Sequence, residues 1–129
     1  MEADGSWSLD SQAPGLELLQ AGLNGRAVDL ARFGALYLRQ GAWRGRQLVP
    51  RDWVAASTRV DTRTDPAPEF QYCWWTRPGD GAGNDFWAQG NHGQFIDVAP
   101  GRGLVLVRFG IDYRCAHWPE LLAALARRL

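Results

Sequence analysis

Lysine is absent from this 129-residue chain, and all 14 of its cationic side chains are arginine. Acidic side chains also number 14, so no excess of positive charge favours nucleic-acid binding. No apolar run approaches the ~20 residues that a membrane-spanning helix needs. The polar start, Met1 to Ser8, lacks the apolar core of a signal peptide. The chain therefore predicts no membrane segment of its own and leaves its compartment unknown.

Cysteine and histidine are scarce, with two of each. Cys73 and Cys115 lie far apart in the sequence, which favours two free thiols over a disulfide without deciding between them. A zinc site needs three or four ligands, and His92 and His117 are well separated. We therefore predict no metal and no cofactor.

Helical patterns occupy the middle and the end of the chain. Residues 1–25 are loop-rich, 26–58 predict a helical part, and 70–129 predict antiparallel strands followed by a C-terminal helix. Apolar residues recur at three- and four-residue spacing over 26–40, with Asn24 as the expected N-cap and Gly41 as the expected stop. The final segment predicts an amphipathic helix that packs on a sheet.

Strand patterns dominate the second half. Phe70 to Thr76 is aromatic and predicts one strand, and two apolar runs flanking 100–103 predict an antiparallel hairpin. The run Leu104 to Val107 is apolar on both faces, which is typical of an inner strand. The predicted fold class is α+β, with an antiparallel sheet of three or more strands and helices on one face.

The stretch from Phe86 to Pro100 resembles the C-terminal strand pair of the serine β-lactamase superfamily, which includes class C β-lactamases, penicillin-binding proteins and esterases. The helix pattern Asp29 to Gly34 is similar to that family as well. The resemblance implies that residues 1–129 are a partial domain, the C-terminal part of a β-lactamase/transpeptidase-like fold. The residues that carry it in the strand pair are Phe86, Trp87, Ala88, Gly90, His92, Gly93, Gln94 and Pro100.

The chemistry of that family is acyl transfer through a serine in Ser-x-x-Lys, assisted by Tyr-x-Asn. Without lysine the first motif cannot exist here, and no tyrosine is followed two positions later by asparagine. The chain therefore contains none of these catalytic residues. The third family motif, often Lys-Thr-Gly, is replaced within Asp85 to Gly90, which disfavours β-lactams because the motif lysine helps to bind a substrate carboxylate.

The resemblance implies that Phe86 to Gly90 edges the substrate cleft. The backbone N–H of Ala88 is the expected oxyanion donor, with Gln89 and Gly90 as alternatives. His92 is either a polar group at the cleft rim or a loop residue that shapes the turn. The expected substrate-contacting residues are Trp87, Gln89, Gly90, His92, Gly93 and Gln94.

Three functions fit these observations. The chain is the C-terminal portion of a hydrolase acting on a small ester or amide, inactive alone; or a non-catalytic binding module; or a structural domain. The seven tryptophans favour the second if some of them form an aromatic surface. Apolar surface left uncovered in a partial domain would also promote self-association.

Overall fold

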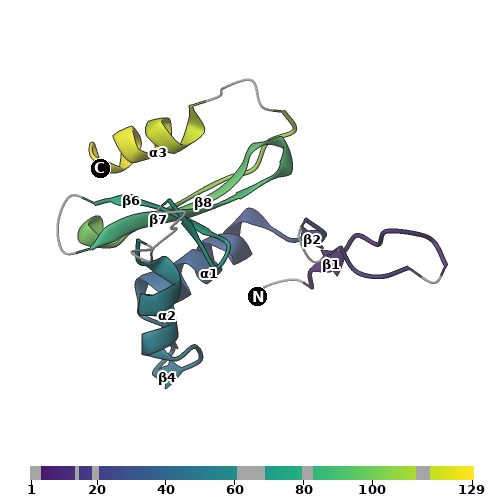
Figure 1. Cartoon of the computed structure of the whole chain (residues 1–129), viewed down its shortest axis with the longest axis horizontal. Coiled ribbons are helices and arrows are strands. Elements are labelled where there is room, and N and C mark those ends of the chain that lie inside the picture. Colours follow the sequence, from purple (N-terminus) through teal and green to yellow (C-terminus); the bar gives the residue numbers. More distant parts are fainter. Residues whose placement is uncertain (1–3, 14, 19–20, 61–68, 80–82, 113–116) are drawn as a thin grey trace, which may run out of the picture.

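The computed structural model of the chain (Figure 1) describes residues 4–13, 15–18, 21–60, 69–79, 83–112 and 117–129. Two short hairpins precede the main sheet, β1 (Ser6–Trp7) with β2 (Leu23–Asn24) and β3 (Ala42–Trp43) with β4 (Arg46–Gln47). The helices are α1 (Ala27–Leu38), α2 (Arg51–Thr58) and α3 (Trp118–Ala126). None of these described helices is long and apolar enough to cross a membrane.

The main sheet is antiparallel throughout and has five strands in the order β5-β6-β7-β8-β9. The predicted α+β class is confirmed. The inner position predicted for Leu104 to Val107 is wrong, because β9 is the outermost strand of the sheet. The strands are β5 (Phe70–Gln71), β6 (Trp74–Pro78), β7 (Asn84–Gly90), β8 (Gln94–Ala99) and β9 (Leu104–Arg108).

The single strand predicted from Phe70 to Thr76 is also wrong. Tyr72 and Cys73 both have positive φ, 48° and 69°, and form a two-residue turn between β5 and β6. Turns of this kind favour glycine or asparagine, so the sequence carries no signal for this one. The Cys73 thiol is free and exposed, and Cys115 lies outside the described residues.

Helices cover both faces of the sheet rather than one as predicted. Helices α1 and α2 lie on one face and α3 lies on the other (Figure 1). Side chains alternate between faces along a strand, so Ile96, Val98 and Val105 meet α1. Leu122, Ala123 and Ala126 form the buried side of α3.

Helix α1 lies close against the sheet at Gly34. A Cβ added there would meet Val105 Cγ1 at 2.7 Å and Ile96 Cγ2 at 3.0 Å. The helix does not begin at the Asn24 cap that the sequence predicts. Its N-cap is Arg26, without a side-chain hydrogen bond, because the Asn24 amide bonds to Ser8 and Gly22 in the β1–β2 hairpin.

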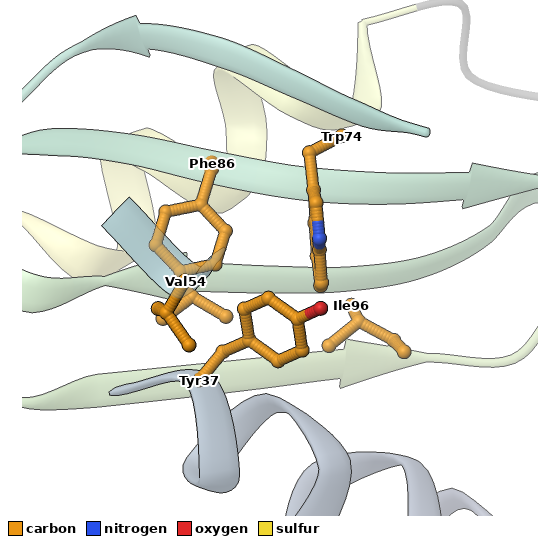
Figure 2. Packing of buried hydrophobic residues seen from close by; sticks show 6 residues of the cluster. Tyr37, Val54, Trp74, Phe86 and Ile96 are labelled. Atoms are coloured by element: carbon orange, nitrogen blue, oxygen red, sulfur yellow. The ribbon is translucent and has the colours of Figure 1, made fainter. Parts of the chain in front are cut away.

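An aromatic cluster fills the core between α1, α2 and the sheet (Figure 2). Trp74 and Phe86 meet edge to face with centroids 5.0 Å apart, and Tyr37 lies 4.8 Å from the Trp74 ring. Val54 of α2 closes one side of the cluster. Each such ring pair contributes about 0.5–1.5 kcal/mol beyond the burial of its area, so the cluster fixes both helices on this face.

A charged pair is buried on the α3 face. Asp97 is 1% exposed, and its Oδ2 accepts a hydrogen bond from Arg77 Nη2 at 2.7 Å. Burial raises the pKa of the Asp97 carboxyl, opposed by the hydrogen bond and the charge of Arg77. Arg77 also lies 3.7 Å from Asp85 Oδ2, so one guanidinium spans carboxylates of β7 and β8.

The contact at Gly34 can be tested with alanine. We expect Gly34→Ala to lower the free energy of unfolding by about 1–2 kcal/mol, because crowding outweighs the better helix propensity of alanine. Urea midpoints would measure it. Gly25→Ala is the matched control, since an added Cβ meets nothing within 4 Å there. Equal midpoints for both variants would contradict the close contact.

The Asp97 carboxyl predicts a pH dependence of stability. A raised folded-state pKa means that the contribution of Asp97 to stability is fully present below the pKa of about 3.8 that the carboxyl has in the unfolded chain, and is lost as pH rises through the folded-state pKa. We therefore expect the stability of the wild type relative to Asp97→Asn to fall with rising pH over that window. Chemical denaturation at several pH values measures this difference. A constant difference for Asp97→Asn across the pH range would refute the assignment.

Candidate functional site

A cavity of about 590 Å³ lies between the segment that precedes α1 and the turn that joins β7 to β8. Three segments enclose it: 21–25 before α1, 90–94 around the turn η1 (Asn91–Gly93), and 109–111 after β9. Leu30 of α1 forms part of its wall. The cavity therefore lies where α1 begins beside one end of the sheet.

The turn η1 is held by its neighbours. His92 and Gly93 have positive φ, 58° and 77°. The Gln94 amide donates to the Gly110 carbonyl and accepts from the Gly110 N–H at 3.0 Å, as a strand partner would. Arg108 donates to the Gly93 carbonyl, and its guanidinium lies 3.9 Å from the centre of the Trp118 ring. These bonds fix the rim of the cavity to the end of β9.

The opposite wall is held by the β1–β2 hairpin. Asn24 Nδ2 donates to Ser8 Oγ at 3.0 Å and to the Gly22 carbonyl at 2.9 Å. Ser8 N–H also donates to the Gly22 carbonyl at 2.7 Å. The segment 21–25 is thus fixed by hydrogen bonds that come from outside the cavity.

The described lining of the cavity contains no Asp, Glu, Lys or Arg side chain. Its apolar walls come from Leu23, Leu30, Phe109 and Ile111. Leu23, Phe109 and Ile111 are exposed, so the cavity is open to solvent. What its described residues offer a ligand is apolar surface, backbone groups and neutral amides.

One side of β7 is unpaired next to this cavity. The pairing of β6 with β7 ends at Trp75↔Trp87, whereas β8 pairs with β7 as far as Gly90↔Gln94. Within the described ladder, the last three residues of β7 therefore have a partner on the β8 side alone. This open edge resembles the cleft-edge position expected for the strand.

The direction of each backbone N–H on β7 follows from one hydrogen bond between β6 and the residue before β5. Thr76 N–H donates to the Glu69 carbonyl at 2.7 Å, so it points towards β5. Backbone N–H groups alternate in direction along a strand of an antiparallel sheet. The Trp75 N–H therefore points to β7, and the N–H of its partner Trp87 points back to β6. The N–H of Ala88 then points to β8 and faces Ile96.

The expected donor Ala88 therefore faces a neighbouring strand rather than the open edge. The Gln89 N–H points to the open side, and the Gly90 N–H points back to β8. Gly90 is extended, with φ −114° and ψ 172°, so the alternation continues and the Asn91 N–H also points to the open side. Asn91 lines the cavity and Gln89 does not. Sequence reasoning missed Asn91 because its backbone, not its side chain, gives it this position.

The expected contact residues separate into two groups. Gly90, His92 and Gln94 line the cavity, whereas Trp87, Gln89 and Gly93 do not. Trp87 lies on the α3 face, stacked against Trp75 with ring centroids 6.3 Å apart. Gly93 is buried in the turn.

No serine is among the described residues that line the cavity. Ser57 is buried in α2 and donates to the Val54 carbonyl at 3.2 Å, and the other three serines lie in the N-terminal segment. Within the described part of the chain, no group of three or more His, Cys, Asp or Glu side chains could hold a metal ion. The described lining of the cavity offers backbone donors and apolar walls but no Ser, Thr, Cys or Lys side chain.

Comparisons with known proteins support the fold. No protein-family model and no curated protein matches the chain. Among solved structures, it is similar to one named "Putative 6-aminohexanoate-dimer hydrolase from Bacillus anthracis", with 23% identity and a TM-score of 0.73. The match covers 93% of this chain and 33% of the other, so the chain spans about one third of that structure's length. The chain thus has a hydrolase-like α+β fold.

Proposed function

We propose that residues 1–129 form one wall of the substrate cleft of an acyl-serine hydrolase of the β-lactamase type, whose nucleophile lies outside this sequence. The observation that carries the proposal is the open edge of β7 at the rim of a cavity, with the Asn91 N–H on that open side. A backbone N–H in such a position can stabilise the oxyanion that forms when a serine attacks a carbonyl. The likeness in fold to a structure named as a hydrolase supports this.

The substrate class that fits best is an uncharged ester or amide. The cavity has apolar walls, and its described lining contains no Arg or Lys side chain that would pair with a substrate carboxylate. Two of its polar side chains, Asn24 and Gln94, already hold the surrounding loops through hydrogen bonds. Selection would therefore rest on shape and on backbone groups rather than on charge.

Reading the coding DNA upstream of Met1 in the same frame tests the proposal directly. The expected result is an open frame that encodes Ser-x-x-Lys and, later, Tyr-x-Asn, because this chain lacks both motifs. An in-frame stop codon close upstream, together with a ribosome-binding site before Met1, would rule out catalysis by this mechanism.

In the polypeptide that carries the nucleophile, we expect Asn91→Pro to slow acyl-enzyme formation by about 10²–10³-fold, because it removes one oxyanion donor. Proline suits this position, which is the first residue of η1. Burst kinetics with a chromogenic ester would measure the step.

Asn91→Ala is the matched control, since it removes the side chain and keeps the N–H; its rate should stay within a few-fold of wild type. If Gln89→Pro abolishes acylation while Asn91→Pro does not, the donor is Gln89 and this assignment is wrong.

A binding module is the second candidate, favoured by a row of aromatic rings on the α3 face. Phe70, Trp75 and Trp87 are directly paired across β5, β6 and β7. Their rings lie 4.8 Å and 6.3 Å apart, and the Arg77 guanidinium lies 4.8 Å from Trp87. Stacked rings of this kind bind flat or apolar ligand faces. A saturable ligand whose binding is lost in Trp75→Ala but not in Asn91→Pro would favour this candidate.

A further inference from the structure

Arg108 ends β9 and connects two segments that line the cavity, although it is not itself among the described lining residues. It pairs across the sheet with Phe95, whose neighbour Ile96 meets α1, so Phe95 and Arg108 point to the α3 face. A diagonal neighbour in an antiparallel pair lies about 7–8 Å away, within reach of a long side chain. Gly93 is such a neighbour, and Arg108 Nη1 donates to its carbonyl. The side chain therefore joins the end of β9 to the turn η1.

Two glycines form the slot that holds the guanidinium. A Cβ built on Gly93 or on Gly110 would overlap the guanidinium of Arg108. Gly93 also has φ 77°, a conformation that favours glycine, whereas at Gly110 the lack of a side chain matters for space alone. The two glycines belong to the segments 90–94 and 109–111, which enclose the cavity. The guanidinium thus packs against the backbone of both segments.

Trp118, at the start of α3, is the third contact of the guanidinium. The centre of its ring lies 3.9 Å from Arg108 Cζ, well within the range of a cation over an aromatic face. The ion pairs between described residues do not include Arg108. A charged donor forms a stronger hydrogen bond to a carbonyl than a neutral donor does. The charge of Arg108 therefore acts on the turn η1 and on α3.

The turn η1 depends on contacts from outside it. His92 and Gly93 both have positive φ, 58° and 77°, and for histidine that conformation is unfavourable. A strained backbone persists only where the surrounding structure holds it in place. The Gln94 side chain bonds to Gly110, and Arg108 bonds to the Gly93 carbonyl. Of these two contacts, the one from Arg108 is made to a residue with positive φ.

We propose that Arg108 is a positioning residue for acyl transfer, which holds the turn η1 so that the Asn91 N–H stays at the cavity. This inference rests on the function proposed above. Asn91 and Gly93 belong to the same three-residue turn, so a shift of the Gly93 peptide group would also move the Asn91 N–H. Misplacing a catalytic group by about 1 Å can cost 10²-fold in rate. Arg108 acts through the backbone and does not need to touch the substrate.

Amide exchange of the 129-residue chain tests the positioning without any catalysis. Arg108→Met removes the charge and the donor and keeps an unbranched side chain. The Gly110 N–H, bonded to Gln94 Oε1 at 3.0 Å, reports on the joint between the two segments. We expect its protection factor to fall about tenfold or more, while that of the Val98 N–H in the core changes less than about threefold. A loss of global stability would lower both alike.

Two further variants sharpen this measurement. Arg108→Lys should give an intermediate protection factor, because an ammonium keeps a charged donor but lacks the planar fork of a guanidinium. Arg39→Met is the matched control, since it removes a cation that lies 5.3 Å from the Trp43 ring, in a pair that is not part of the cavity lining. It should leave the protection of the Gly110 N–H unchanged.

A double-mutant cycle in the polypeptide that carries the nucleophile tests the effect on catalysis. We expect Arg108→Met to slow acyl-enzyme formation about tenfold or more, with a change in KM of less than about threefold. The same substitution should have almost no further effect in Asn91→Pro, which already lacks the N–H, because the two residues act through one contact. A merely structural role would slow both backgrounds equally.

Unchanged protection of the Gly110 N–H in Arg108→Met would overturn the inference and leave the proposed function intact, as would equal slowing in both backgrounds. Normal acylation by Asn91→Pro would instead overturn the donor assignment, and the inference with it. If Arg108→Met does not fold, Gly110→Ala replaces it, because the added Cβ displaces the guanidinium from the slot. Unchanged protection of the N–H at position 110 in that variant would also refute the inference.

Discussion

The close approach of α1 to the sheet at Gly34 is the contact on which the rest of the structure depends. With only a hydrogen at that position, the helix can lie against Val105 and Ile96. One turn later, Tyr37 then reaches the Trp74 and Phe86 rings. At its other end the same helix carries the segment 21–25 to the side of the turn η1, where the cavity forms. Core and cavity are therefore two consequences of one helix position.

Local sequence patterns predicted the elements that depend on local preference. The periodicity after Arg26 located α1 to within two residues at each end. The expected stop, Gly41, is preceded by the C-cap Arg39 and by Gln40, which already has positive φ. The turn at Tyr72 and Cys73 was missed because neither residue normally takes positive φ. The edge position of β9 was missed because a strand's neighbours are set by pairing between distant residues. Side-chain patterns report which faces are covered, but they do not report which edges are.

The candidate site also combines residues that local sequence patterns predict with one feature that depends on strand pairing. His92, Gly90 and Gln94 were predicted because a polar, glycine-containing turn between strands is visible in the sequence, and they line the cavity. The donor role that we propose for Asn91 has no such signal, because the direction of a backbone N–H depends on strand pairing. Buried carboxylates lie in two places, Asp97 with Arg77 on the α3 face and Asp29 with Arg32 on α1. The described lining of the cavity contains no Asp, Glu, Lys or Arg side chain.

The length of the turn η1 couples core, cavity and sheet edge. Gly90 pairs with Gln94 across a turn of three residues, and this register decides which residues of β8 face α1. One inserted residue would move every side chain of β8 to the opposite face, exposing Val98, which is fully buried. The same insertion would break the two hydrogen bonds between the Gln94 amide and the Gly110 backbone, which hold the cavity rim. The turn is therefore constrained by packing on one side of the sheet and by the cavity at its end, and the two constraints cannot vary independently.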